Sequence, residues 1–158
     1  MIINPHDPPP RRWIESTLVE HHGPERVGPI AAQIVHQLRD GDPDLGLARR
    51  VIADHPHFLY GRNASNRYAH GGWAYLTLGM DTQAWSLLVT LERTAMLFIG
   101  RGSFPVPTPA ALIFTYAALR RHQLDAAYLG IQLARLRRLT PPEEEDVELL
   151  EACLRASA

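Results

Sequence analysis

The placement of proline and glycine is the feature that most restricts the fold of this chain, because it divides the sequence into short segments. The run Asp7-Pro8-Pro9-Pro10 cannot enter a helix interior, since proline lacks a backbone N–H and restricts the residue before it. We therefore expect residues 1–10 to form an extended arm. Further breaks are expected at Gly23-Pro24, Asp40-Gly41-Asp42-Pro43, His55-Pro56, Gly79-Met80-Asp81 and Gly100–Pro109.

Between these breaks, apolar residues recur with the spacing of helices. In the second segment, for example, Ile30, Ile34, Val35 and Leu38 lie on one helical face. Strand-like alternation occurs at Phe104–Pro107, where two prolines exclude the segment from the interior of a sheet. The pattern therefore predicts an all-α fold. The expected helices cover residues 11–22, 29–39, 44–54, 67–79, 81–98, 110–121 and 123–138, and a last helix begins near Pro141 and ends near Arg155.

Length and charge limit the class of protein. The chain has 158 residues, which is the size of one domain, so we expect residues 11–158 to form a single domain behind the arm. The net charge of -1 provides no field that would attract nucleic acid. No apolar run reaches the length of a membrane span, and the N-terminal residues lack the layout of a signal peptide. These features predict a cytoplasmic protein that binds neither nucleic acid nor membrane.

The residue types that carry most enzymatic chemistry are absent or poorly placed. All 16 basic residues are arginines, so mechanisms that need lysine are excluded. The single cysteine, Cys153, excludes an intramolecular disulfide and a multi-cysteine metal site. The densest histidine pairs, His21-His22 and His55-Pro-His57, lack further ligands at the spacing that zinc requires. We therefore expect a protein that is not an enzyme and has no metal and no cofactor.

Three helix pairs follow one another, with turns at Gly41, Gly79 and His122, and this raises the question of internal repeats. In the tetratricopeptide pattern, the first helix of a pair carries small and aromatic residues, the turn carries glycine, and the second helix carries small residues. The middle pair follows this pattern most fully and the first pair least. The matching residues are Tyr68, Gly72, Tyr75, Gly79, Ala84, Leu88 and Leu91 in the middle pair, Ala111, Phe114, Ala118, His122, Ala127 and Ala134 in the third, and Ile30, Ile34, Gly41, Gly46 and Ala53 in the first.

On these residues, the chain resembles a divergent tetratricopeptide-repeat protein over roughly residues 28–139. The resemblance implies stacked antiparallel helix pairs, an α-solenoid of about three pairs with an N-terminal helix and a C-terminal capping helix. The alternative is an unrelated α-helical bundle whose alanine and glycine positions agree by chance.

In the family, the first helices of successive pairs line a concave groove. The resemblance implies an apolar groove with aromatic anchors at Trp73 and Tyr116, suited to a peptide with hydrophobic side chains. The same spacing also fits core positions, so the sequence leaves both interpretations of these two residues open. The groove positions carried over from the family are Ala31, Val35, Leu38, Asn66, Ala69, Trp73, Leu76, Leu112, Tyr116 and Leu119, with Arg39 and Arg120 at the rim.

The layout of a short N-terminal helix, three divergent repeats and a closing helix is similar to that of the class II chaperones of bacterial type III secretion. The resemblance implies a non-enzymatic, cytoplasmic chaperone or adaptor that holds a hydrophobic segment of a protein or peptide partner. A bacterial immunity protein that neutralises a cognate toxin is the alternative hypothesis. Because an exposed apolar groove drives self-association, we also expect a homodimer or an obligate complex.

Overall fold

In the computed structural model, every regular element of the described residues is a helix, which confirms the all-α prediction. A short helical turn at residues 12–14 precedes the longer helices. The predicted helix 29–39 and the predicted turn at Gly41 lie outside the described residues. The described residues are 4–14, 43–58, 64–99 and 106–158. The helices are α3 (Pro43–Phe58), α4 (Ala64–Thr77), α5 (Asp81–Ile99), α6 (Thr108–Arg120), α7 (Leu124–Arg135) and α8 (Pro141–Ser157).

The helix boundaries differ from the predicted ones at a few ends. The prediction that α3 ends at His55-Pro56 is wrong, because the helix continues through Pro56. Packing of α3 against α4 outweighs the preference of the residue before proline for extended backbone. α4 begins earlier and α7 ends earlier than predicted. The start of α8 agrees with the prediction: Pro141 lies in the first turn, and Thr140 and Glu143 form a reciprocal capping box.

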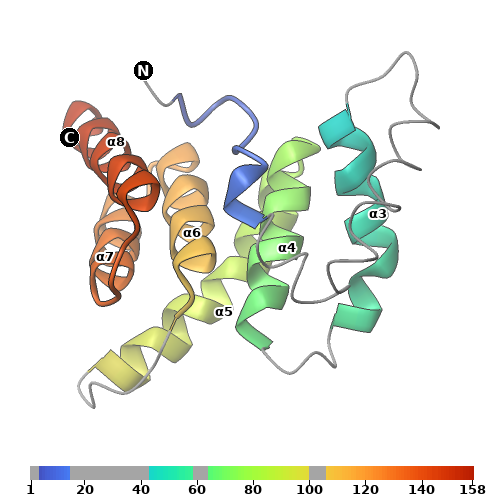
Figure 1. The fold of residues 1–158 in the computed structure, drawn as a ribbon, viewed down its shortest axis with the longest axis horizontal. Coiled ribbons are helices and arrows are strands. Elements are labelled where there is room, and N and C mark those ends of the chain that lie inside the picture. The colour runs from blue at the N-terminus through green and yellow to red at the C-terminus, as the bar shows by residue number, and fades with distance from the viewer. Residues whose placement is uncertain (1–3, 15–42, 59–63, 100–105) are drawn as a thin grey trace.

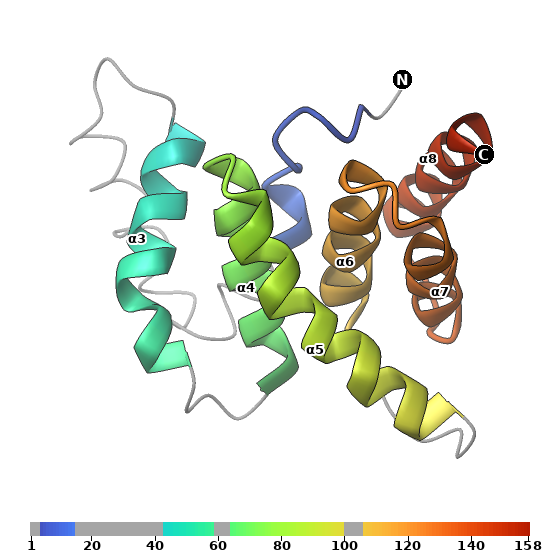
Figure 2. The ribbon, with the colours of Figure 1, turned by 180° about the vertical axis from the view of Figure 1, so that it is seen from behind.

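Each helix packs against the next one along the chain, and α4 and α6 occupy the centre (Figure 1). α4 contacts α3, α5 and α6, while α6 also contacts α5, α7 and α8. Seen from behind, α5 runs diagonally across the molecule (Figure 2). The core fills the space between these helices. Its largest fully buried side chains include Trp73, Leu76, Leu88, Ile113, Phe114, Tyr116 and Leu150.

The turns that join α4 to α5 and α6 to α7 share one hydrogen-bond pattern. In each turn a residue with positive φ follows the helix: Gly79 with φ 75° and His122 with φ 54°. Glycine adopts this conformation without a Cβ clash, as predicted for position 79, whereas His122 adopts it with a side chain. Both turns form the Schellman motif, in which Met80 N donates to Tyr75 O at 2.8 Å and Gln123 N donates to Ala118 O at 2.8 Å.

Two glycines mark places where helices approach closely. A Cβ at Gly72 would lie 3.0 Å from the Leu88 side chain of α5 and 3.1 Å from that of Ile113 in α6. This agrees with the prediction that a small residue is needed at position 72. The repeat pattern does not single out Gly130 of α7, where a Cβ would overlap the hydroxyl oxygen of Thr115 in α6. Both glycines therefore hold neighbouring helices close together.

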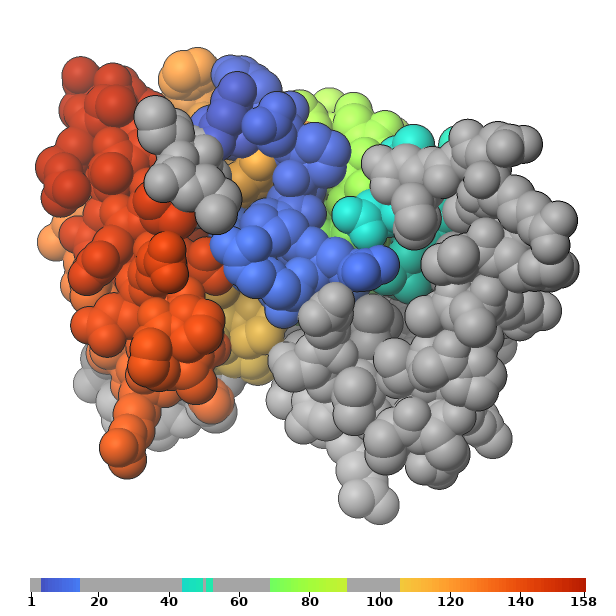
Figure 3. Space-filling model, turned by 45° about the horizontal axis from the view of Figure 1, so that its top comes forward, coloured from blue at the N-terminus to red at the C-terminus, as the bar shows by residue number. Residues whose placement is uncertain are grey.

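Residues 4–10, called the arm below, contain no helix and lie across α4 and α6 (Figure 3). The arm begins with a turn in which Asp7 N donates to Asn4 O at 3.0 Å. His6 N donates to the Asn4 side-chain oxygen at 3.0 Å. Asparagine at the first position and Pro5 at the second favour such a turn. The local sequence therefore defines the shape of the arm before it contacts the helices.

The three prolines that follow differ in their burial. Pro9 is buried, Pro10 is half-buried and Pro8 is exposed. A proline has no backbone N–H that burial could leave unpaired. Pro9 can therefore enter the helical surface without that penalty.

Candidate functional site

The candidate site is the contact between the arm and the two central helices. Three side chains reach the arm from these helices: Trp73 from α4, and Tyr116 and Arg120 from α6. All three use N–H or O–H groups, and all of their acceptors on the arm are main-chain carbonyl oxygens. We call Trp73, Tyr116 and Arg120 the groove donors.

Trp73 is completely buried, and its indole Nε1 donates to the carbonyl oxygen of Pro9 at 3.1 Å. A buried indole N–H requires an acceptor, since an unpaired buried donor is destabilising. The arm supplies that acceptor. The arm thus completes the hydrogen bonding of a residue at the centre of the fold.

Tyr116 is also buried, and its hydroxyl oxygen lies 2.7 Å from Asn4 O and 2.5 Å from Asp7 O. Because a hydroxyl has one hydrogen, it donates to one of these carbonyls at a time. Burial raises the pKa of Tyr116 to about 12, and the guanidinium of Arg120 opposes this increase only in part. The hydroxyl is therefore neutral and able to donate at neutral pH.

The guanidinium of Arg120 binds the arm and the helices at the same time. Its side chain is 6% exposed. Nε donates to Pro5 O and Nη2 to Asp7 O, both at 2.7 Å. Nη1 donates to Leu76 O at 3.0 Å and to the Asp81 carboxylate at 2.8 Å. The Asp81 carboxylate balances the buried charge of Arg120, which would otherwise be strongly unfavourable.

The short helical turn at residues 12–14, which follows the arm, is hydrogen-bonded to α8. Asp146 is buried in α8, and its carboxylate accepts from Trp13 Nε1 at 2.9 Å and from Arg12 Nη2 at 2.5 Å. The Trp13 ring meets the Tyr116 ring edge to face, with 5.4 Å between ring centres. These contacts hold the C-terminal end of the arm in place beside the groove donors.

The structure places the predicted groove residues inside the protein rather than along an open groove, and of the two interpretations left open for Trp73 and Tyr116 it supports the core position. The arm covers Trp73 and Tyr116, and packing between helices buries the others. The side chain of Arg120, predicted at the rim, is nearly inaccessible and binds both the arm and the helices. The predicted residues that are buried are Ala69, Trp73, Leu76, Leu112, Tyr116 and Leu119.

Some predicted groove residues cannot be placed. Asn66 belongs to α4, but its side chain lies outside the description. Ala31, Val35, Leu38 and Arg39 lie outside the described residues.

Sequence reasoning missed the acceptors of this site. Most of them are main-chain carbonyls of the arm, and these leave no trace in the identity of a residue. It also missed Asp146, which lies in a run of acidic residues that is typical of an exposed helix start. The proline run was the available signal, because a segment without N–H groups can be buried through its carbonyls alone.

The raised pKa of Tyr116 leads to a prediction about stability at high pH. The folded state holds the hydroxyl proton up to about pH 12, while the unfolded chain releases it near its ordinary pKa of about 10. The contribution of the neutral hydroxyl is therefore complete below about pH 10 and is lost as the pH rises toward 12. Urea unfolding measured from about pH 9 to about pH 11 should show wild type losing more stability than Tyr116→Phe. Parallel losses in the two proteins would contradict the burial of this hydroxyl.

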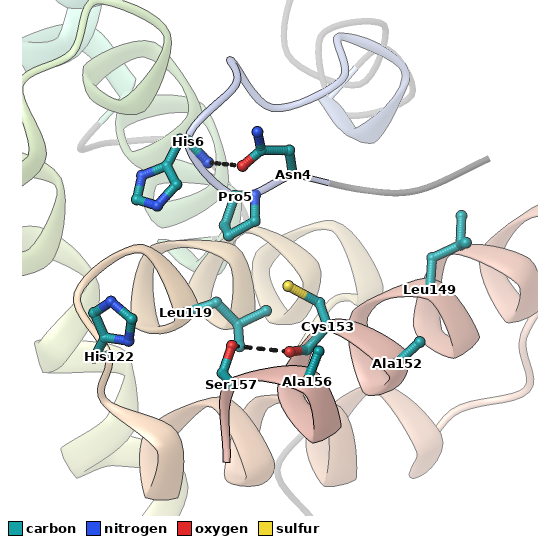
Figure 4. Close-up of a pocket in the computed structure, with 10 residues that line it drawn as sticks. All are labelled: Asn4, Pro5, His6, Leu119, His122, Leu149, Ala152, Cys153, Ala156 and Ser157. Atoms are coloured by element: carbon teal, nitrogen blue, oxygen red, sulfur yellow. Dashed lines mark hydrogen bonds between the residues drawn. The ribbon is translucent and has the colours of Figure 1, made fainter.

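A hollow lies between the start of the arm and α8 (Figure 4). It has a volume of about 500 Å³, and Leu119, Leu149 and Cys153 contribute to its walls. Burial raises the pKa of the Cys153 thiol, so the reactive thiolate is disfavoured near neutral pH. The arrangement gives this hollow no evident catalytic chemistry.

No protein-family model, curated protein or solved structure matches this chain. Within the described residues, no cluster of His, Cys, Asp and Glu side chains could hold a metal ion. None of the described helices combines the length and the apolar character that a membrane crossing requires.

Proposed function

We propose that this chain is a non-enzymatic peptide-binding module that takes an extended segment of a partner protein between α4 and α6. The observation that carries the proposal is the way the groove donors bind the arm. Trp73, Tyr116 and Arg120 all donate to carbonyl oxygens of a segment that has no regular structure. Binding of main-chain groups together with pockets for a few side chains is the usual chemistry of extended-peptide recognition.

The groove donors would supply affinity, and the apolar surface around them would supply selectivity. Every peptide has carbonyl groups, so bonds to them select little by sequence. Pro9 is the buried side chain of the arm, and its place beside Trp73 defines a site for an apolar residue. This agrees with a partner segment that contains hydrophobic side chains.

We infer further that α4 to α8 form a tetratricopeptide-like stack. The identical turns after α4 and α6 support this inference, as does the contact of each first helix with the next, α4 with α6. Trp73 precedes Gly79 by the same number of residues as Tyr116 precedes His122. The aromatic donor therefore lies at the same distance from the following turn in α4 as in α6.

Within this proposal, a cytoplasmic chaperone or adaptor is the class of protein that best fits a groove for extended segments. An immunity protein remains the alternative prediction from the sequence. The prediction of a homodimer or obligate complex rested on an exposed apolar groove. Because the arm covers the groove donors, the proposed function does not require self-association.

Peptide display tests the proposal. In chains that carry Pro9→Arg, which should displace the arm, peptides selected on wild type should bind about tenfold more weakly when Arg120→Gln is added, because a bond from a charged donor contributes about 1.5–3 kcal/mol. Arg121→Gln is the matched control, since Arg121 is the exposed neighbour. Selected peptides that bind all three proteins equally would place the binding site elsewhere and contradict the proposal.

A further inference from the structure

We infer that the arm is a tethered occupant of the peptide-binding groove, and that the partner binds with a proline-containing segment that displaces it. The inference rests on the proposed function and adds to it the chemistry of the partner and a means of regulation. Three observations support it: the hydrogen bonds that hold the arm, the small number of its residues that are buried, and the carbonyl groups that it presents to the helices.

The helices bind the arm through hydrogen bonds to its main chain and leave most of its residues exposed, as they would with a separate peptide ligand. Of its residues, Asn4, His6, Asp7 and Pro8 are exposed. The groove donors bind its carbonyls, and Pro9 is its one buried residue. The donors contact main-chain carbonyls, so a segment from another protein could make the same bonds if it formed the same turn, which Asn4 and Pro5 favour in the arm.

The groups on the groove favour proline in the partner. A chain that binds through its carbonyls leaves its N–H groups without partners on this surface, and proline removes that group. Proline at the second position of a turn also fixes one backbone angle before binding, so such a segment loses less conformational freedom when it binds. Indole N–H and phenol O–H donors beside apolar ring surface, as at Trp73 and Tyr116, suit such a segment.

Tethering makes the arm an effective competitor. A segment attached by a short linker acts at an effective concentration in the millimolar range. A free peptide competes with the arm for the groove. Its apparent affinity is therefore its intrinsic affinity multiplied by the fraction of molecules in which the groove is open. Release of the arm should therefore increase the affinity for a partner peptide without any change in the groove.

Pro9→Arg in the full chain tests the inference. The new side chain would place bulk and charge at a buried position beside Trp73, so the arm should leave. Pro8→Arg is the matched control, because Pro8 is exposed. The probe is a fluorescent peptide of residues 1–10. We expect Pro9→Arg to bind it at least about tenfold more tightly than wild type or Pro8→Arg.

The indole N–H signal of Trp73 in a ¹⁵N nuclear magnetic resonance spectrum separates the outcomes. It should shift in Pro9→Arg, stay in place in Pro8→Arg, and return when the peptide is added. A shifted signal with no peptide binding would overturn the proposed function and this inference together. Equal binding to wild type and Pro9→Arg, lost in Arg120→Gln, would overturn the tethered competitor and leave the proposed function standing.

A measurement on the unmodified chain covers the case in which Pro9→Arg does not fold. Unlabelled peptide of residues 1–10 is added to ¹⁵N-labelled wild type at millimolar concentration. The backbone amide signals of His6 and Asp7 in the labelled chain should move to the positions of an unfolded segment, while the Trp73 indole signal stays. Amide signals of the arm that do not respond to excess peptide would overturn the inference.

Discussion

Replacing Trp73 with alanine is expected to lower the free energy of unfolding by about 4 kcal/mol. The side chain is completely buried in α4, so its removal leaves a large cavity and also removes the donor for Pro9 O. Most small domains have a total stability of about 5–15 kcal/mol, and the variant should be partly unfolded at moderate temperature. Urea unfolding followed by circular dichroism measures the change.

Two further variants separate packing from hydrogen bonding at this position. Trp73→Phe keeps an aromatic ring but lacks the indole N–H, so we expect a smaller loss of about 1–2 kcal/mol. Tyr128→Ala removes an aromatic side chain that is 60% exposed and should change stability by less than about 0.5 kcal/mol. Similar losses for Trp73→Ala and Tyr128→Ala would show that Trp73 is not buried, and the account of the core would be wrong.

Replacing Gly130 with alanine is expected to lower the free energy of unfolding by about 2–3 kcal/mol. In an exposed helix the same change raises stability by about 1 kcal/mol, because alanine has the higher helix propensity. At position 130 the added Cβ would overlap the Thr115 hydroxyl oxygen and lie 3.0 Å from Phe114 Cδ1. α6 and α7 would therefore have to move apart. Chemical unfolding measures the loss, and a gain in stability would contradict the close approach of these helices.

A double-mutant cycle identifies the cause of that loss. Thr115→Ala removes the hydroxyl that the new Cβ would meet, and with it the bond from Thr115 Oγ1 to Ala111 O. If the overlap is responsible, the double variant Gly130→Ala with Thr115→Ala should be more stable than the sum of the two single changes predicts. Strict additivity would show that Thr115 is not the obstacle.

The helices were predictable from the sequence because their limits are set by local chemistry. The turn at Gly79 needs a positive φ, which glycine adopts readily. The capping box at the start of α8 depends only on Thr140 and Glu143, which are close in the sequence. The end of α3 was not predictable, because helix packing outweighs the local effect of Pro56. Gly130 was missed for a similar reason: the need for glycine comes from Thr115 on another helix.

Of the candidate site, only the residues that donate hydrogen bonds could be predicted from the sequence. The resemblance to tetratricopeptide repeats implied that Trp73, Tyr116 and Arg120 share one surface, and in the structure all three contact the arm. The exposure of Trp73 and Tyr116 was left open, because periodicity cannot show that a distant segment covers a helix face. That segment was expected as an extended arm, but nothing local to it indicates where it packs.

Contact between the arm and Trp73 is the central claim, and nuclear Overhauser spectroscopy on the full chain tests it most directly. We expect cross-peaks between the Trp73 indole N–H and protons of Pro9 and Pro10, with slow exchange of that N–H with solvent. An indole N–H that exchanges rapidly and shows no cross-peak to residues 4–10 would contradict it.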